Sequence, residues 1–469
     1  MSRSLAAAWA CGLLACTGPP PAWDEPPPPG REAPVVAPGA LLRAELPNGL
    51  RVIILEDHRL PRVALGLEVR RGEASVPPGQ AGLAAFAGEL MERGAGSRGA
   101  IELAEAVDEL GASLGVGSDW DAMGVNVSGL RRDLERLLEI LADVALRPRF
   151  EEAEAAKVRA ETLASLERAK DRPETLVGWS LLRALYGGHR FGLPLSGLPE
   201  SVSRFDAAQA RSLHRGFFVP GNAVFFASGD VEAAALLQEV GRIFGAWPAG
   251  PLPDAGPPPP APAPPERRIV LVDRPELEQA HIAIAHEGIS RADPDRIAAA
   301  LLNTVIGGGG FSSRLMEKVR AEEGLVYGIG SDFSMRRAGG PFSVQTSTRV
   351  AEARRVLDLV LAELERARRE PPGEEELADA RRLAVGSFAL GLETSDAVAA
   401  SLVELDVQGL PEDSLDTYRA RVRATAGEEV ARLARELLHP ERAAIVVAGP
   451  ARVLQPQLEG LGPLEVVQP

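Results

Sequence analysis

The chain has 469 residues, 45% of them hydrophobic and 25% charged, which is the composition of a globular protein large enough for two or more domains. The formal net charge of −15 argues against nucleic acid as the main partner, because phosphate binding requires a basic surface. Both cysteines, Cys11 and Cys16, lie near the N-terminus, so the rest of the chain has no internal disulfide and no cysteine metal site.

Residues 1–16 are typical of a secretion signal, with a short basic start and an apolar run too short to cross a membrane. Leu13-Leu14-Ala15-Cys16 resembles the box of a lipoprotein signal peptide, at which bacteria lipidate the cysteine. The resemblance implies a lipid anchor on Cys16, and Thr17 in place of an aspartate implies the outer membrane, facing the periplasm. The alternative is an ordinary signal peptide cleaved near Ala15. Residues 17–40 are proline-rich and are expected to form an extended tether.

A second proline-rich run, residues 248–266, is expected to link an N-terminal half, residues 41–247, to a C-terminal half, residues 267–469. The halves resemble each other. Pro220–Gly229 and Pro440–Gly449 both predict a strand that runs into a turn, at an offset of about 220 residues, the size of one domain. The alternative is chance similarity between alanine-rich segments. Several matches in the same order favour a duplicated domain.

Strand and helix patterns alternate in the N-terminal half. Strands are predicted at residues 50–55 and 61–70, with two more within 112–129. Helices are predicted at residues 80–94, 101–110, 131–145, 151–170 and 173–187. This pattern predicts an α+β fold in which helices pack on a mostly antiparallel sheet.

The helix predicted at residues 80–94 has one apolar face, formed by Leu83, Phe86, Ala87, Leu90 and Met91. It closely resembles the first helix of the pitrilysin/insulinase-like zinc metallopeptidases (the inverzincins), which reads Gly-Leu-Ala-His-x-x-Glu-His-Met. In that family the two histidines bind zinc and the glutamate is the general base. In this chain the residues that flank the zinc-binding positions match the family, as Gly82-Leu83-Ala84 before them and Leu90 to Gly94 after them.

The zinc ligands and the general base of that helix are missing from this chain. The histidine positions are Ala85 and Glu89, and the general-base position is Gly88. Alanine and glycine have no side-chain atom that binds zinc or takes a proton from water. The family's third ligand, a glutamate, aligns with Thr162 or, after a one-residue shift, with Glu161. We therefore expect a degenerate metal site that binds no zinc. The alternatives are an unconventional site that uses the two glutamates, which suit harder cations, or two solvated carboxylates.

The resemblance extends over the whole body of the chain. Asn48-Gly49-Leu50 resembles the family's opening strand, and Leu141–Pro148 resembles its helix-to-loop segment. Tyr186–Gly192 with Pro194–Gly197 resembles its Tyr-Pro-x-His turn. The fold implied is two homologous α/β domains that form a clamshell around a peptide.

The C-terminal half carries a second family signature. A helix is expected from an N-cap at Ser312 to a stop at Gly324, followed by a strand from Leu325. Arg320 and Tyr327 match, in identity and spacing, the Arg and Tyr that bind the substrate beside the zinc in the family. A guanidinium and a phenol can donate hydrogen bonds to a substrate carbonyl and its oxyanion. Without the resemblance, they would be a solvated helix residue and a half-buried strand residue.

Two further segments resemble elements that bind ligands in other proteins. Gly307–Gly310 also suggests a phosphate loop, but it lacks the Gly-Lys-Ser/Thr end that supplies the phosphate lysine. Leu114–Ser118 occupies the place of the family's edge strand, which takes the substrate as an added strand.

In some bacterial members of the family one chain carries the zinc helix and a second chain supplies the Arg–Tyr pair. The resemblance implies that this chain is of the second kind, the non-catalytic subunit of a heterodimeric, lipid-anchored, periplasmic metallopeptidase. The implied partners are an insulinase-like subunit with an intact His-x-x-Glu-His motif, which would hold the zinc, and an extended peptide. The alternative is a purely structural or peptide-binding subunit. A self-sufficient enzyme with an unfamiliar metal site is a third possibility.

Overall fold

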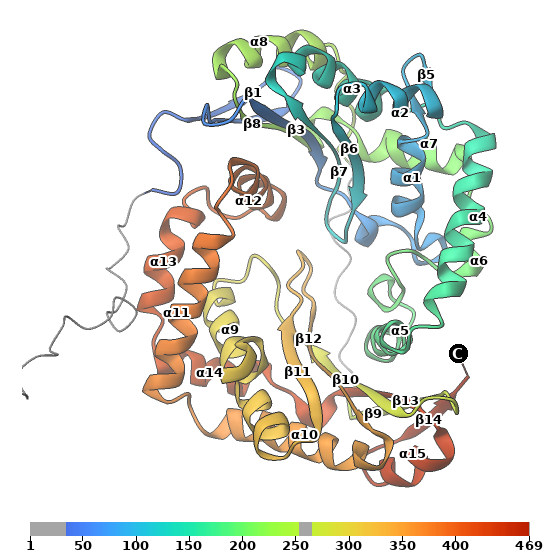
Figure 1. Cartoon of the computed structure of the whole chain (residues 1–469), viewed down its shortest axis with the longest axis vertical. Coiled ribbons are helices and arrows are strands. Elements are labelled where there is room, and N and C mark those ends of the chain that lie inside the picture. The colour runs from blue at the N-terminus through green and yellow to red at the C-terminus, as the bar shows by residue number, and fades with distance from the viewer. Residues whose placement is uncertain (1–33, 253–264, 469) are drawn as a thin grey trace, which may run out of the picture.

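The computed structural model describes residues 34–252 and 265–468. The predicted signal peptide with Cys16, most of the tether and most of the linker lie outside these ranges. The structure is about 51% helical and 21% strand, with one six-stranded sheet in each half (Figure 1). The predicted α+β class is confirmed.

The N-terminal sheet has the strand order β1-β2-β8-β3-β7-β6. Its members are β1 (Leu41–Glu45), β2 (Arg51–Glu56), β3 (Arg62–Val69), β6 (Ser113–Ser118), β7 (Met123–Leu130) and β8 (Ala223–Gly229). Only β2 and β8 run parallel, and the other neighbours are antiparallel. On β3 the side chains alternate, so that Val63, Leu65 and Leu67 enter the core.

The C-terminal sheet has the order β14-β9-β13-β10-β12-β11. Its members are β9 (Arg268–Asp273), β10 (Gln279–Glu287), β11 (Val326–Phe333), β12 (Pro341–Arg349), β13 (Ala444–Gly449) and β14 (Leu464–Val467). From β9 to β11 this order follows that of β2 to β6 in the N-terminal sheet, with β13 in the place of β8. The outer strands differ, because β1 pairs antiparallel with β2 whereas β14 pairs parallel with β9. β8 and β13 both come after a short turn that begins with proline, at Pro220–Asn222 and Pro440–Arg442. The two sheets therefore repeat each other in the way that the sequence predicts.

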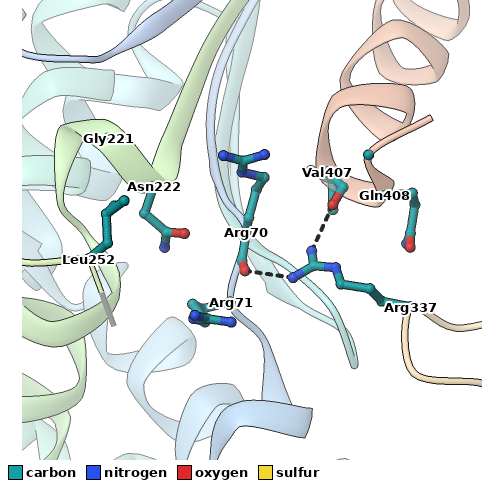
Figure 2. Close-up of a pocket in the computed structure, with 9 residues that line it drawn as sticks. Arg70, Arg71, Gly221, Asn222, Leu252, Arg337, Val407 and Gln408 are labelled. Carbon is teal, nitrogen blue, oxygen red and sulfur yellow. Dashed lines mark hydrogen bonds between the residues drawn. The ribbon is translucent and has the colours of Figure 1, made fainter. Parts of the chain in front are cut away.

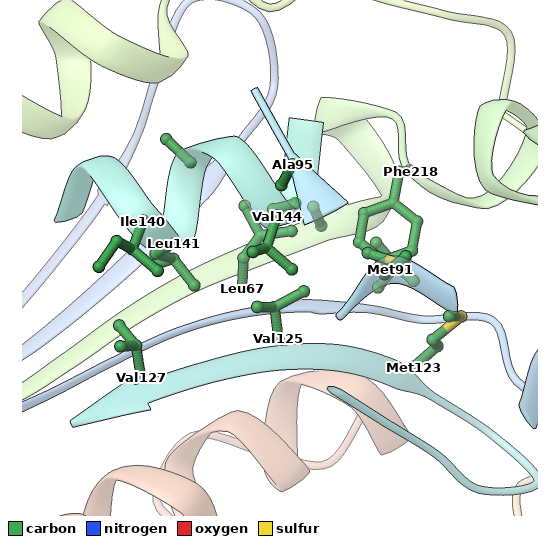
Figure 3. Packing of buried hydrophobic residues seen from close by; sticks show 14 of the residues in the cluster. Leu67, Met91, Ala95, Met123, Val125, Val127, Ile140, Leu141, Val144 and Phe218 are labelled. Atoms are coloured by element: carbon green, nitrogen blue, oxygen red, sulfur yellow. The ribbon is translucent and has the colours of Figure 1, made fainter. Parts of the chain in front are cut away.

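Helices build the two main cores together with the sheets. In the N-terminal half they are α1 (Leu83–Met91), α2 (Ala100–Asp108), α3 (Leu134–Leu146), α4 (Glu152–Ala169), α6 (Pro199–Val202), α7 (Ala207–Phe217) and α8 (Ala233–Phe244). In the C-terminal half they are α9 (Arg296–Asn303), α10 (Ala353–Arg369), α11 (Glu374–Leu390), α13 (Ser414–Ala424), α14 (Gly427–Leu437) and α15 (Ala451–Leu458). Figure 3 shows Ile140, Leu141 and Val144 of α3 above Val125 and Val127 of β7. Among the described helices, none combines the length and the apolar character that crossing a membrane requires.

The helix predicted at residues 80–94 is shorter in the structure, where α1 spans Leu83–Met91. A separate turn, Pro78–Gln80, precedes it. The two are divided because Gly82 has a φ of +94°, in the left-handed region that a helix cannot continue through. The other predicted helices and strands of this half are present, with ends shifted by a few residues.

One helix of the C-terminal half, α12 (Ser395–Gln408), packs on the sheet of the N-terminal half. Leu402 and Val403 of α12 are buried in one cluster with Ile53 of β2 and Val224 of β8. These side chains lie on the face of the sheet opposite the main core, because they alternate with the core residues along each strand. Figure 1 shows α12 reaching across to the strands β1 and β8.

The equivalent helix of the N-terminal half, α5 (Pro173–Tyr186), packs on the C-terminal sheet. Leu181 of α5 is buried in one cluster with Ala283 of β10 and Val446 of β13. The two halves therefore exchange helices, and each sheet is covered on its second face by the other half. Burial of one leucine side chain contributes about 2 kcal/mol, so these two contacts hold the halves together.

We expect Leu402→Ala to lower the free energy of unfolding by about 2–4 kcal/mol, because it leaves a cavity between α12 and the N-terminal sheet. Denaturant titration followed by circular dichroism measures the change. The matched control is Leu383→Ala on the exposed side of α11, for which we expect a change below about 0.5 kcal/mol. Equal losses in the two variants would contradict the helix exchange.

Candidate functional site

The helix with the predicted zinc-site positions is anchored by a buried ion pair. Glu73 accepts hydrogen bonds from the backbone N–H groups of Gly82 (2.5 Å) and Ala84 (2.9 Å), and so caps the start of α1. Nη2 of Arg190 lies 2.5 Å from Oε1 of Glu73, and the two side chains are 1% and 0% exposed. A Cβ on Gly82 would lie 2.7 Å from Cα of Gly197, so only glycine fits at this turn.

Trp120 connects this anchor to the C-terminal half. The guanidinium of Arg190 lies 5.0 Å from the centre of its ring, and that of Arg336, from the β11–β12 loop, lies 4.3 Å away. Burial lowers the pKa of Arg336 to about 10. Burial also raises the pKa of Glu73 and lowers the pKa of Arg190, because each charge is removed from water. Pairing and stacking on the ring therefore compensate these arginines for lost hydration.

The three degenerate positions on α1 have different surroundings. Ala85 is half-buried, Gly88 is buried and Glu89 is exposed. A Cβ on Gly88 would meet Cγ1 of Val116 on β6 and Cε of Met123 at 3.5 Å, which is ordinary van der Waals contact. The general-base position of the family therefore faces the edge strand β6 and has room for a methyl group.

The third ligand position lies on α4, which packs against α1. Oγ1 of Thr162 donates a hydrogen bond to the carbonyl of Val158 within the helix (2.8 Å). Glu161 is exposed and pairs with Arg93 (2.7 Å). Across the described ranges, no three His, Cys, Asp or Glu side chains are arranged to hold a metal ion. These residues do not fit zinc, because Ala85 puts a side chain without a ligand atom in place of one histidine, and the hydroxyl of Thr162 is hydrogen-bonded within its own helix.

The predicted edge strand Leu114–Ser118 lies in β6, which pairs only with β7 at the end of the sheet. The backbone N–H of Val116 is on the free side of this strand and donates to Oε1 of Glu92. Burial raises the pKa of Glu92. A peptide that adds to β6 would need this N–H group. Strand addition at this point therefore requires the Glu92 side chain to move away.

The glycine run begins in a π-helical turn, Thr304–Gly308, and a second π-helical turn, Met316–Glu322, lies within the segment where the sequence predicts a helix. The predicted N-cap at Ser312 is wrong, because the turn that leaves the glycine run continues through Ser312 and the helix begins after Ser313. The predicted stop at Gly324 agrees with the structure, which gives this residue a φ of +64°. π-Helical turns are rare and are often found at functional sites.

Tyr327 protrudes from a β-bulge on the edge strand β11. The pairing of β11 with β12 shifts by one residue between Val326 and Ile329, and the Tyr327 side chain is 92% exposed. The guanidinium of Arg320 lies 5.9 Å from the Tyr327 ring and 4.7 Å from the ring of Phe311, which is itself 76% exposed. A bulge re-aims the side chain that it carries. The structure thus brings Arg320 and Tyr327 together at the surface, and Tyr327 is not a half-buried strand residue.

Two sequence families match the chain. Residues 51–198 match the insulinase family (peptidase family M16), and residues 204–383 match the peptidase M16 inactive domain. The chain belongs to the insulinase-like peptidase family. The two matched ranges together cover more than half of the chain and include α1, the glycine run, Arg320 and Tyr327.

Similar members of the family come from several bacteria. An uncharacterized zinc protease of Streptomyces coelicolor is 26% identical over 88% of this chain and 90% of its own length. The uncharacterized zinc protease YmxG of Bacillus subtilis is 23% identical over 86% and 96%. The crystal structure of a peptidase M16 inactive domain from Pseudomonas fluorescens has a TM-score of 0.81 at 27% identity, covering 87% of this chain and 98% of that one. A protease from Helicobacter pylori, at 18% identity, shares the fold with a TM-score of 0.79 over 87% and 99%.

Sequence reasoning missed the positions of four residues of this region. Glu73 and Arg190 are 117 positions apart, so no spacing indicated that they pair. The contact of Glu92 with the edge strand also depends on the folded arrangement. Phe311 was visible as part of the glycine-run signature, but its place beside Arg320 follows only from the turn at the end of that run.

We expect Arg190→Ala to lower the free energy of unfolding by about 3–5 kcal/mol, because it leaves the carboxylate of Glu73 buried without its partner. Thermal and denaturant unfolding measure the loss. The control is Arg242→Ala, in an exposed pair with Glu239, which should change stability by less than about 1 kcal/mol. A small loss of stability in Arg190→Ala would show that the carboxylate of Glu73 becomes hydrated or protonated with little change in the free energy of unfolding.

We expect Gly88→Ala to raise the free energy of unfolding by up to about 1 kcal/mol, because alanine favours the helix and its methyl group fits beside Val116. Gly82→Ala is the opposite control and should be destabilising, since its φ and its contact with Gly197 exclude a side chain. Differential scanning calorimetry compares the melting temperatures. Destabilisation by Gly88→Ala would mean that α1 needs this glycine for close packing.

Proposed function

We propose that this chain is the non-catalytic subunit of a two-chain insulinase-like zinc metallopeptidase. Its family membership includes the inactive-domain match, which fits a subunit without catalysis of its own. Ala85 and Gly88 support this proposal, because neither can bind zinc or act as a base. The third metal-ligand position of the family supports the proposal as well, since the hydroxyl of Thr162 donates its hydrogen bond within its own helix.

The observation that carries the proposal is the position of Arg320, half-buried, beside the exposed Tyr327. The guanidinium of Arg320 lies beside the phenol ring of Tyr327. Tyr327 belongs to the bulged edge strand β11, which a peptide can approach. Both groups are hydrogen-bond donors and can stabilise the oxyanion that forms when a peptide carbonyl is attacked. Their role would be to bind and polarise the substrate at the zinc of another chain.

The proposal implies specific partners. A second insulinase-like subunit with an intact His-x-x-Glu-His motif would hold the zinc and the general base. The substrate would be an extended peptide, held mainly by backbone pairing along an edge strand. A lipid on Cys16 would attach the chain to the outer membrane on the periplasmic side.

The experiment that tests the proposal measures zinc content and peptidase activity of the purified chain, alone and mixed with such a partner. We expect no zinc and no activity alone, and in the mixture an activity above that of the partner itself. Stoichiometric zinc with activity in the chain alone would overturn the proposal. Binding of the partner without a gain in activity would favour a structural or peptide-binding subunit.

In the active mixture, we expect Arg320→Ala to lower kcat/KM by about 100-fold and Tyr327→Phe by at least about tenfold, because each removes a donor to the oxyanion. Steady-state kinetics on a fluorogenic peptide measures both. The control is Arg349→Ala, an exposed arginine at the end of β12, which should leave kcat/KM unchanged. Full activity of the Arg320 and Tyr327 variants would exclude their role in catalysis.

A further inference from the structure

Phe311 is an exposed aromatic side chain beside the Arg320–Tyr327 pair. Its side chain is 76% exposed and that of Tyr327 is 92% exposed. Among the exposed large hydrophobic side chains in the described part of the chain, these two are the aromatic ones. A phenyl ring that remains in water adds little to the stability of the fold. The position of Phe311 is therefore not explained by packing of the core.

The turn that carries Phe311 is held in one conformation. It is a short 3-10 turn, Gly310–Ser312, and it starts with a φ of +64° at Gly310, in the left-handed region that glycine adopts readily. The buried Ser313 closes the turn, because its hydroxyl (2.8 Å) and its backbone N–H (3.1 Å) both donate to the carbonyl of Gly310. The phenyl ring therefore projects from an ordered segment.

The glycine run places this turn close to the strand β11. A Cβ on Gly307 would lie 2.6 Å from Oγ of Ser331 on β11, so only glycine allows the backbone to come this near. Oγ of Ser331 in turn donates to Oδ1 of Asn303, at the end of α9 (2.7 Å). These contacts join the run to the strand that carries Tyr327, and so fix Phe311 in relation to that residue.

The two exposed rings both lie near the guanidinium of Arg320. Its Cζ atom is 4.7 Å from the centre of the Phe311 ring and 5.9 Å from the centre of the Tyr327 ring. A ring face attracts a cation electrostatically without neutralising its charge. Phe311 is the nearer of the two rings, and it has no hydrogen-bonding atom of its own. Its effect on a substrate would therefore pass through Arg320.

The carboxylates that follow Arg320 in the chain are paired with other cations. Glu322 pairs with Lys318 (2.7 Å), and Glu323 pairs with Arg355. Within the described ranges, the guanidinium of Arg320 forms neither an ion pair nor a hydrogen bond. Its N–H groups are therefore available as donors to a ligand.

We propose that Phe311 is a positioning residue, whose ring holds the guanidinium of Arg320 where it can donate to the substrate. An arginine side chain has many conformations, and a fixed ring beside it favours the few in which the charge lies over that ring. The inference rests on the proposed function, in which Arg320 polarises the peptide carbonyl. It adds to that site a residue that carries no reactive group.

Heteronuclear NMR of the arginine side chains tests the contact on the full chain alone. The Nε–Hε signal of Arg320 is assigned by its loss in Arg320→Lys. We expect Phe311→Leu to move this signal toward the position of a free arginine, because the ring current is lost. Phe311→Tyr should leave the signal in place, since it keeps an aromatic face. A signal that does not move in Phe311→Leu would overturn the inference.

Steady-state kinetics in the active mixture tests the role. Phe311→Leu should lower kcat about fivefold and leave KM within about twofold, because a misplaced donor weakens binding of the transition state more than binding of the substrate. Phe311→Tyr should keep the kcat of the unmodified chain. The matched control is Leu390→Ala, a 75% exposed side chain at the end of α11, which should change neither constant.

A double-mutant cycle separates positioning from direct contact with the peptide. In the Arg320→Ala background, Phe311→Leu should cause no further loss of kcat, since it acts through the missing guanidinium. An equal loss in both backgrounds, or a rise in KM alone, would overturn the positioning role. An inactive mixture would contradict the proposed function, whereas the NMR signal, measured without a partner, decides the contact separately. Circular dichroism confirms that each variant is folded.

Discussion

The exchange of α5 and α12 between the halves is the contact on which the rest of the structure depends. A sheet with one covered face would expose a wide apolar surface, such as Ile53 and Val224 on the N-terminal sheet. α12 of the C-terminal half covers this face of the N-terminal sheet, and α5 of the N-terminal half covers the corresponding face of the C-terminal sheet. The tips of two hairpins then meet between the sheets, where Trp120 is held between two arginines. A pocket lined by Arg70, Arg71 and Arg337 lies at the same junction (Figure 2), so its shape is a product of the exchange.

This arrangement decides where a peptide can bind. Helices of the opposite half occupy the second face of each sheet over its central strands, so an extended chain finds free backbone at the edges. β6 and β11 are equivalent edges of the two sheets, and they differ in what they offer. The amide of Val116 on β6 is already engaged by Glu92, whereas the bulge on β11 presents Tyr327 outward. Of these two edges, β11 in the C-terminal half is therefore the one whose side chains are free to meet a peptide.

Sequence reasoning predicted most of the local structure, because helices and strands follow from the spacing of apolar side chains. It also predicted the repeat and placed Arg320 and Tyr327 near each other. It could not predict that α12 leaves its own half, since an apolar helix face looks the same whichever sheet it covers. The exposure of Tyr327 could not be predicted either, because it depends on a bulge that shifts the strand pairing by one residue and has no signal in the sequence. The pair of Glu73 and Arg190 joins positions far apart in the chain, so it could not be predicted either.

The exchange also has a consequence for the order of synthesis. The strands β2, β3 and β8 leave the ribosome long before α12, which is made near the end of the chain. At typical translation rates the interval is on the order of ten seconds, during which one face of a formed sheet is uncovered. The nascent N-terminal half is thus an aggregation-prone intermediate and a natural client for a chaperone.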